Sequence, residues 1–195
     1  MTDTQTVEEE TSHAFDRSKI LSHIDRYNLG GEIEPVAWNV EDQSLSIGFV
    51  SQDNTIIGEL NVDEFLLDEN VEIGIRQTSQ LKKLIKILND EFDIMLDYAG
   101  DQARVMTLQD EQKTVEFRLS DLSVIPNTPN LKKLPEFQVT LNITDRFASD
   151  FRSAESALSE DEFAVRTNAA GVEIVVGYTA DSRSAHNNKV TLPID

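Results

Sequence analysis

Basic side chains gather in three short segments of this chain, at residues 16–27, 78–88 and 144–158. Eight of the 17 lysines and arginines lie there, although the whole chain has a net charge of −19 at pH 7. Clustered lysine and arginine attract a phosphate backbone through charge alone, without reading a base sequence. The side chains that could attract a phosphate backbone in this way are Lys19, Arg26, Lys82, Lys83, Lys86, Arg146 and Arg152.

The same residues have a simpler interpretation, because charged side chains ordinarily fill the exposed face of an amphipathic helix. The large net charge likewise has a simple role in solubility. However, basic side chains recur on three helices in equivalent positions of a repeat, and chance is a less satisfactory explanation for that. If a sheet packs against one side of all three, their basic faces give an acidic protein one basic surface.

Residues that could do catalytic chemistry are scattered. His13, His23 and His186 form no metal-ligand spacing, and we expect His23 on an exposed helix face. Gly30-Gly31 follows a helix instead of opening one, so it does not predict a phosphate-binding loop. Paired acidic residues fall at turns and helix ends, where carboxylates serve solubility and capping. We therefore expect no enzyme, no metal and no cofactor.

The elements that must position the basic residues recur with a period of 62 to 66 residues. Each of three repeats contains an extended run, a short amphipathic helix and three strands joined by polar turns, which is one supersecondary unit. We expect Asp16 to cap the first helix, and Thr78 or Ser79 to cap the second. Expected strands lie at 33–39, 44–50, 55–62, 70–76, 92–98, 103–108, 113–119, 137–143, 162–167, 172–178 and 188–194. The pattern predicts an α+β fold with antiparallel sheets and the helices on one face.

Composition divides the chain into four parts. Residues 1–12 are acidic and lack periodicity, which predicts a disordered tail. Residues 13–122 hold two repeats and form the first expected domain. Residues 123–136 contain three of the five prolines and predict a connector. Residues 137–195 hold one repeat and form an incomplete second domain.

We expect neither a membrane span nor an export signal in this chain. No apolar run approaches the ~20 residues that span a bilayer, so we expect no membrane association. The N-terminus is acidic and lacks an apolar stretch, which argues against export. The chain has no cysteine, which fits a reducing cytoplasm.

Three segments carry a likeness to a known family. They are QLKKLIKILNDEFDIMLDY (80–98), VIPNTPNLKKLPEF (124–137) and FQVTLNITDRFASDFRSAESALSEDEFAVRTNAAGVEIVVGY (137–178). Together with the repeat and the basic helices, they resemble the DNA sliding clamps, the processivity factors of replicative DNA polymerases. Within that family the chain is most similar to the clamp of T-even-type tailed phages, over about residues 14–195.

The resemblance implies a mechanism without catalysis. Clamp subunits join head to tail into a ring, a homotrimer in such phages, and helices line a hole that duplex DNA threads. The seven basic residues named above would face that hole. A clamp-loader ATPase opens the ring, and DNA polymerase docks a tail peptide near the connector. Ile125, Pro126, Leu131 and Leu134 would line that partner pocket. The resemblance also implies a viral protein that supports late transcription in the cytoplasm of an infected bacterial host.

The chain departs from this family in its number of repeats. A clamp subunit of this type has four repeats and the sequence shows three, so we expect a fragment or a last repeat replaced by another association. Two other functions stay open. An acidic interaction protein or DNA mimic would use the negative surface to occupy a nucleic-acid-binding partner, and an enzyme of unrecognised type would lack all familiar motifs.

Overall fold

Each of the three helices begins at a polar residue or group that accepts hydrogen bonds from its first turn. The computed structural model describes residues 14–67, 69–129, 136, 140–159, 162–169, 171–177 and 188–194. The first helix, α1 (Arg17–Asn28), is capped by Asp16, whose carboxylate accepts from the Lys19 amide at 2.9 Å, as predicted. The third helix, α3 (Asp145–Leu158), is capped by the Thr144 hydroxyl, which accepts from the Phe147 amide at 3.1 Å.

The cap of α2 (Thr78–Ile85) comes from another repeat, and the prediction that Thr78 or Ser79 caps it is wrong. The Glu34 carboxylate accepts from the Ser79 amide at 3.0 Å, and the Glu34 carbonyl accepts from the Thr78 hydroxyl at 2.7 Å. The helix also ends at Ile85 instead of residue 88, because the amides of Ile87 and Leu88 bond to carbonyls only three residues back.

The chain divides into two compact units, Met1–Leu131 and Lys132–Asp195. The first unit holds two repeats. The first repeat contains β1 (Phe15–Asp16), α1, a short η1 (Leu29–Gly31), β2 (Val36–Glu41), β3 (Ser44–Val50) and β4 (Ile57–Val62). The second contains β5 (Val71–Ile75), α2, β6 (Glu91–Ala99), β7 (Gln102–Gln109) and β8 (Thr114–Arg118), followed by η2 (Leu122–Val124). The predicted tail, residues 1–12, lies outside the described residues.

The two repeats of the first unit exchange their leading strands. One sheet has the order β4-β3-β2-β5 and the other β1-β6-β7-β8, with all neighbours antiparallel. Thus β5 leads the second repeat yet pairs with β2 of the first, and β1 leads the first repeat yet pairs with β6 of the second. Neither repeat can complete its own sheet, so the pair of repeats is the folding unit.

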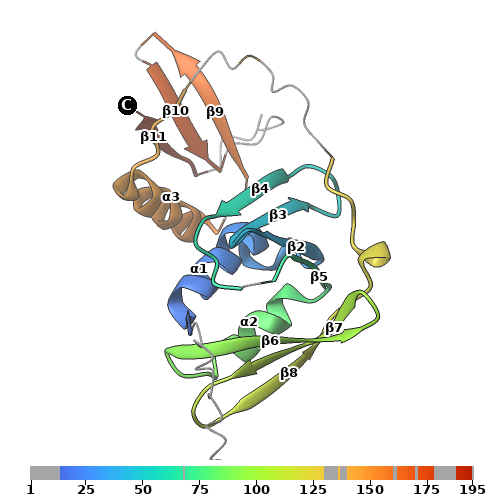
Figure 1. Cartoon of the computed structure of the whole chain (residues 1–195). Helices are drawn as coiled ribbons and strands as arrows, with labels where there is room; N and C mark the ends of the chain where they lie inside the picture. Colours follow the sequence, from blue (N-terminus) through green and yellow to red (C-terminus); the bar gives the residue numbers. More distant parts are fainter. Residues whose placement is uncertain are drawn as a thin grey trace, which may run out of the picture. The chain divides into compact units, whose positions relative to one another are not determined.

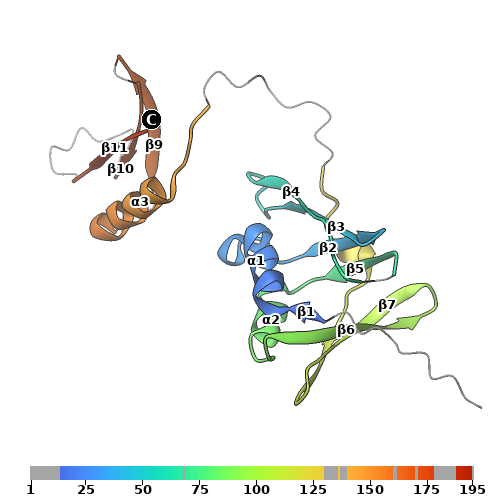
Figure 2. The same ribbon diagram turned by 60° about the vertical axis from the view of Figure 1, so that its left-hand side comes forward.

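One hydrophobic core joins the helices and both sheets of this unit. It contains Ile24 and Tyr27 from α1, Leu81 from α2 and Trp38 from β2, all nearly without solvent exposure. The buried Trp38 ring nitrogen donates to the Tyr27 hydroxyl at 3.2 Å. Figures 1 and 2 show α1 and α2 side by side, and the two helices are in contact. The core therefore fixes the helix pair relative to the strands.

The second unit holds the third repeat, with α3, β9 (Phe163–Asn168), β10 (Gly171–Val176) and β11 (Val190–Ile194). Its sheet has the order β11-β10-β9, and α3 packs on β10 and β11 around Ala154, Ile174, Val176 and Ile194. The predicted strand 137–143 does not form in its described part, since 140–143 have no regular secondary structure. Residues 137–139 lie outside the described residues. The other predicted strands form within three residues of their expected ends.

Candidate nucleic-acid interface

A stripe of nitrogen-bearing side chains runs along α1. Lys19, His23 and Arg26 are spaced four and three residues apart, which places them on one face of a helix. Lys19 and Arg26 are exposed, and the opposite face of α1 enters the core through Ile20, Ile24 and Tyr27. The burial of the apolar face therefore forces the basic stripe outwards.

His23 is half-buried, which differs from the predicted exposed position. Its Nδ1 atom is buried and has no hydrogen-bond partner among the described residues. Burial lowers the pKa of His23, and the nearby charges of Arg26 and Lys19 lower it further. The neutral imidazole form of His23 is therefore favoured in the folded chain.

The second helix adds three lysines that are not equivalent. Lys82 forms an ion pair with Asp25 of α1, and only 22% of its side chain is exposed. Lys83 and Lys86 are exposed, and α2 itself contains no acidic residue. Among the described residues, no ion pair involves Lys19, Arg26, Lys83 or Lys86. The helix pair thus presents four exposed cations that are free to meet phosphates.

Arg17 is a basic residue whose role the sequence did not indicate. Its guanidinium donates to the Leu88 carbonyl and to the Asp90 carboxylate, 71 and 73 residues further along the chain. Its backbone amide donates to the Asp90 carbonyl at 2.8 Å. Arg17 therefore joins the start of α1 to the end of the α2 segment, and it holds the helix pair together instead of adding to the free cations. The sequence could not predict this role, because Arg17 comes close to Leu88 and Asp90 only when β1 pairs within the sheet of the second repeat.

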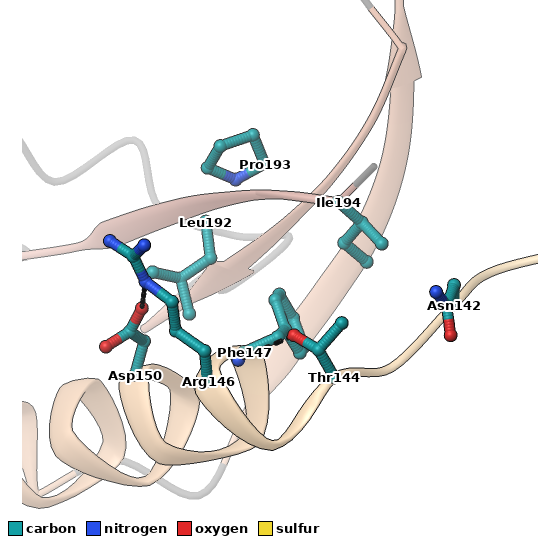
Figure 3. Close-up of a pocket in the computed structure, with 8 residues that line it drawn as sticks. All are labelled: Asn142, Thr144, Arg146, Phe147, Asp150, Leu192, Pro193 and Ile194. Carbon is teal, nitrogen blue, oxygen red and sulfur yellow. Dashed lines mark hydrogen bonds and ion pairs between the residues drawn. The ribbon is translucent and has the colours of Figure 1, made fainter.

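The third helix carries its two arginines in the second unit. Arg146 and Arg152 are both exposed, six residues apart, so their side chains leave α3 about 120° apart. Figure 3 shows the side chains of Arg146 and Asp150 pointing toward one another, with Arg146 Nε 3.8 Å from Asp150 Oδ2. Both residues line a hollow of about 400 Å³. Phe147, Leu192 and Ile194 line the same hollow. This helix has a weaker basic face than α1 and α2, because Asp145, Asp150 and Glu155 dilute it.

The predicted partner pocket falls on the connector that follows β8. Ile125 is 8% exposed and packs near Gly74, whose backbone pairs with Ser120. Pro126 is exposed and lies on a shallow hollow of about 210 Å³ over β2 and β3, beside Asn39 and Gly48. A side chain at Gly48 would meet the Thr128 hydroxyl at 2.9 Å, so glycine allows the connector to lie close to the sheet. Leu131 and Leu134 lie outside the described residues.

Other kinds of site find no support in the described part of the chain. No group of three or more histidine, aspartate or glutamate side chains there could hold a metal ion. None of the described helices is both long and apolar enough to cross a membrane.

Comparison with known proteins places the fold. No protein-family model matches the chain, and no curated protein sequence matches it. Several solved structures, however, match the fold of the chain. Proliferating cell nuclear antigen from Entamoeba histolytica superposes with a TM-score of 0.61 at 15% identity, over 93% of this chain and 72% of that one. The antigen from Thermococcus kodakaraensis gives 0.59 at 17% identity, over 92% and 71%. The fold is DNA-clamp-like.

A bacterial clamp shows the same likeness. The beta clamp of Helicobacter pylori, in a structure with a bound DNA ligase peptide, gives a TM-score of 0.55 at 11% identity over 93% of this chain. Our chain spans about half the length of that protein, 51%. The predicted α+β, clamp-like fold class is therefore confirmed, whereas the predicted site residues stay predictions.

Proposed function

We propose that this chain acts as a sliding clamp, a non-catalytic protein that encircles duplex DNA and tethers a replicative DNA polymerase. The observation that carries the proposal is the α1–α2 pair, which presents Lys19, Arg26, Lys83 and Lys86 without ion-pair partners in the described structure of a DNA-clamp-like unit. In an acidic chain, this local reversal of charge is what a phosphate backbone requires. Arg146 and Arg152 would add to it from the second unit.

Contacts between these basic side chains and DNA phosphates would allow the protein to slide along the duplex. Lysine and arginine contacts to phosphate carry no base specificity, so each register along the duplex is equivalent. Because four exposed side chains release few counterions, the binding is weak enough for movement once a ring holds the DNA. Lys82 would contribute less, since its ion pair with Asp25 already neutralises it.

Assembly and partners follow in the same proposal. Copies would join head to tail into a homotrimeric ring through the outer strands of their sheets, such as β4, β8 and β11, which have one free edge each among the described strands. A clamp-loader ATPase would open the ring. Partner proteins would dock a short peptide at the connector around Pro126. The H. pylori clamp likewise binds a peptide, from DNA ligase. Origin in a T-even-type phage, support of late transcription and action in the host cytoplasm belong to the same proposal.

The experiment is a primer-extension assay on primed circular DNA with the polymerase and clamp loader of a T-even-type phage. Addition of the full chain should increase the length of DNA that the polymerase synthesises each time it binds the primer. A Lys83→Gln/Lys86→Gln variant should lose this gain, whereas Arg118→Gln/Lys189→Gln, which removes two exposed charges outside the helices, should retain it. Equal products with and without the chain would contradict the proposal.

The net charge of −19 favours a second candidate, an acidic interaction protein or DNA mimic. Such a protein would inhibit a nucleic-acid-binding partner through its carboxylates, so the lysine variants would leave the inhibition unchanged. A clamp would instead lose function in the same variants. The pair of lysine substitutions therefore separates the two functions in one experiment.

A further inference from the structure

One acidic side chain stands on the basic surface of the helix pair. Asp25 is the sole acidic residue of α1, and α2 contains none; both helices lie wholly within the described part of the chain. Around it are the five basic residues that the two helices could turn toward a phosphate backbone, namely Lys19, Arg26, Lys82, Lys83 and Lys86. Two roles could explain an acid at this place: a tether between the helices, or a control on the strength of DNA binding.

The carboxylate of Asp25 lies at the seam where α1 and α2 meet. One residue along a helix turns the side chain by about 100°, so Asp25 stands between the buried Ile24 and the exposed Arg26. Lys82 has the corresponding place on α2, between the core and the exposed Lys83. Asp25 and Lys82 form an ion pair across the contact of the two helices, which Figures 1 and 2 show side by side. The pair therefore lies between the core and the exposed basic residues of both helices.

The two partners of this ion pair are not equally exposed. The side chain of Asp25 is 55% exposed, whereas that of Lys82 is 22% exposed. A phosphate that approaches the helix pair therefore meets the carboxylate before it meets the ammonium. Arg26 follows Asp25 on α1, and Lys86 lies one turn beyond Lys82 on α2, so the carboxylate also stands among cations that a phosphate would contact. Asp25 thus opposes DNA binding in two ways: it occupies Lys82 and it repels phosphate.

The charge of Asp25 acts over a range that matters for binding. A unit charge about 8 Å from a phosphate changes the binding constant about twofold in bulk water and about thirtyfold at the effective dielectric constant of a protein surface. Screening is weak at this distance when the salt concentration is below about 0.1 M. An ion pair with an exposed partner, by contrast, adds little to folding stability. The carboxylate therefore affects an approaching phosphate more than it affects the fold.

We propose that Asp25 sets how strongly the helix pair holds duplex DNA, by occupying Lys82 and repelling the phosphate backbone, so that the contacts stay weak enough for sliding. This role of Asp25 rests on the proposed clamp function and adds to it a residue that opposes binding. Loss of the carboxylate releases Lys82 as a further free cation and ends the repulsion, so the affinity for DNA rises. Loss of the Lys82 ammonium leaves Asp25 without its counter-ion, so the affinity falls. A tether predicts the same direction for both changes, because either one breaks the ion pair.

The test titrates each full-length chain with a mixed-sequence DNA duplex in about 50 mM salt, where phosphate contacts are strong, and follows the amide signals of α1 and α2 by nuclear magnetic resonance. Asp25→Asn should lower the Kd about threefold to thirtyfold. It should also steepen the slope of log affinity against log salt by about 0.9, the value for one more phosphate contact. Lys82→Gln should raise the Kd at least about twofold. The double variant Asp25→Asn/Lys82→Gln has the net charge of the natural chain and should bind nearly as the natural chain does.

A matched control separates the place of Asp25 from the total charge of the chain. Asp101→Asn removes the same charge from the exposed turn between β6 and β7, outside both helices, and should leave the Kd unchanged. Dispersed amide signals should show that every variant is folded. An equal fall of the Kd in Asp25→Asn and Asp101→Asn would overturn the proposal. A change in the same direction in Asp25→Asn and Lys82→Gln would also overturn it, and would identify the ion pair as a tether.

The proposed clamp function has its own arm in this experiment. Lys83→Gln/Lys86→Gln should weaken binding, and equal binding by this variant and the natural chain would contradict DNA binding by the helix pair. Weakened binding in that variant together with an unchanged Kd in Asp25→Asn would overturn the role of Asp25 alone. If DNA shifted no amide signal in the natural chain or in Asp25→Asn, both proposals would be contradicted.

Discussion

His23, on the basic stripe of α1, should contribute measurably to the pH dependence of the chain's stability. Its pKa lies below 6.5 through burial and the charges of Arg26 and Lys19. As the pH falls below about 6.5, the unfolded chain therefore takes up a proton that the folded chain resists. This contribution to stability is complete above pH 6.5 and is lost on acidification.

The corresponding prediction is that His23→Gln reduces the loss of unfolding free energy between pH 7.5 and pH 5. Urea unfolding at both pH values measures it. Carboxylates with lowered pKa, such as Asp110, titrate below this window and do not interfere. Identical pH dependence in the variant and the natural chain would contradict the lowered pKa of His23.

Asp110 is the second residue whose environment is unusual. Burial raises its pKa, but the backbone amides of Asn89, Gln112 and Lys113 donate to its carboxylate, each at 2.7 Å, and with the Lys113 ammonium they lower the pKa to about 2. The carboxylate thus ties the β7–β8 turn to the loop that follows α2. This role could not be predicted from the sequence, because Asp110 lies at a turn among other acidic residues.

We predict that Asp110→Asn lowers the melting temperature at pH 7 and reduces its dependence on pH between 4 and 2. The ionised carboxylate stabilises the folded chain above pH 3.8, and this stabilisation is lost as the pH falls toward 2. Differential scanning calorimetry measures both effects. The exposed neighbour Glu111, changed to Gln, is the control and should change neither.

At the scale of elements, α2 depends on a cap from the first repeat. Glu34 accepts from the Ser79 amide and the Thr78 hydroxyl, and no side chain within the second repeat replaces it. Glu34→Ala should cost about 1 kcal/mol of unfolding free energy, the usual effect of losing an N-cap. Glu32→Ala, an exposed neighbour, should cost much less. Equal losses in urea unfolding would mean that the Glu34 carboxylate does not cap α2.

This cap also shows where sequence reasoning succeeds and where it ends. Local signals predicted the helices, the strands and the repeat, because alternation, periodicity and Asp16 at a helix start act over a few residues. Partners that are distant in sequence were not predictable. Glu34 and Ser79, Arg17 and Asp90, and Lys82 and Asp25 meet only because the repeats exchange leading strands. Basic residues could therefore be assigned to helix faces, but not sorted into free cations and structural ones.

At the scale of the whole molecule, the exchange of β1 and β5 decides which pieces of the chain can fold. A piece that contains both repeats of the first unit retains every strand pair of both sheets and the single core. A piece that ends after the first repeat keeps β1 without its partner β6, and β2 without its partner β5. It also exposes the core face of β2, including Trp38.

We therefore predict that residues 1–131 unfold cooperatively on their own, whereas residues 1–67 do not fold. Two-dimensional nuclear magnetic resonance spectra should show dispersed amide signals for the longer piece and collapsed signals for the shorter one. Mixing residues 1–67 with residues 69–131 should restore dispersion, because each piece supplies the leading strand that the other lacks. A folded 1–67 piece would mean that one repeat can close its own sheet.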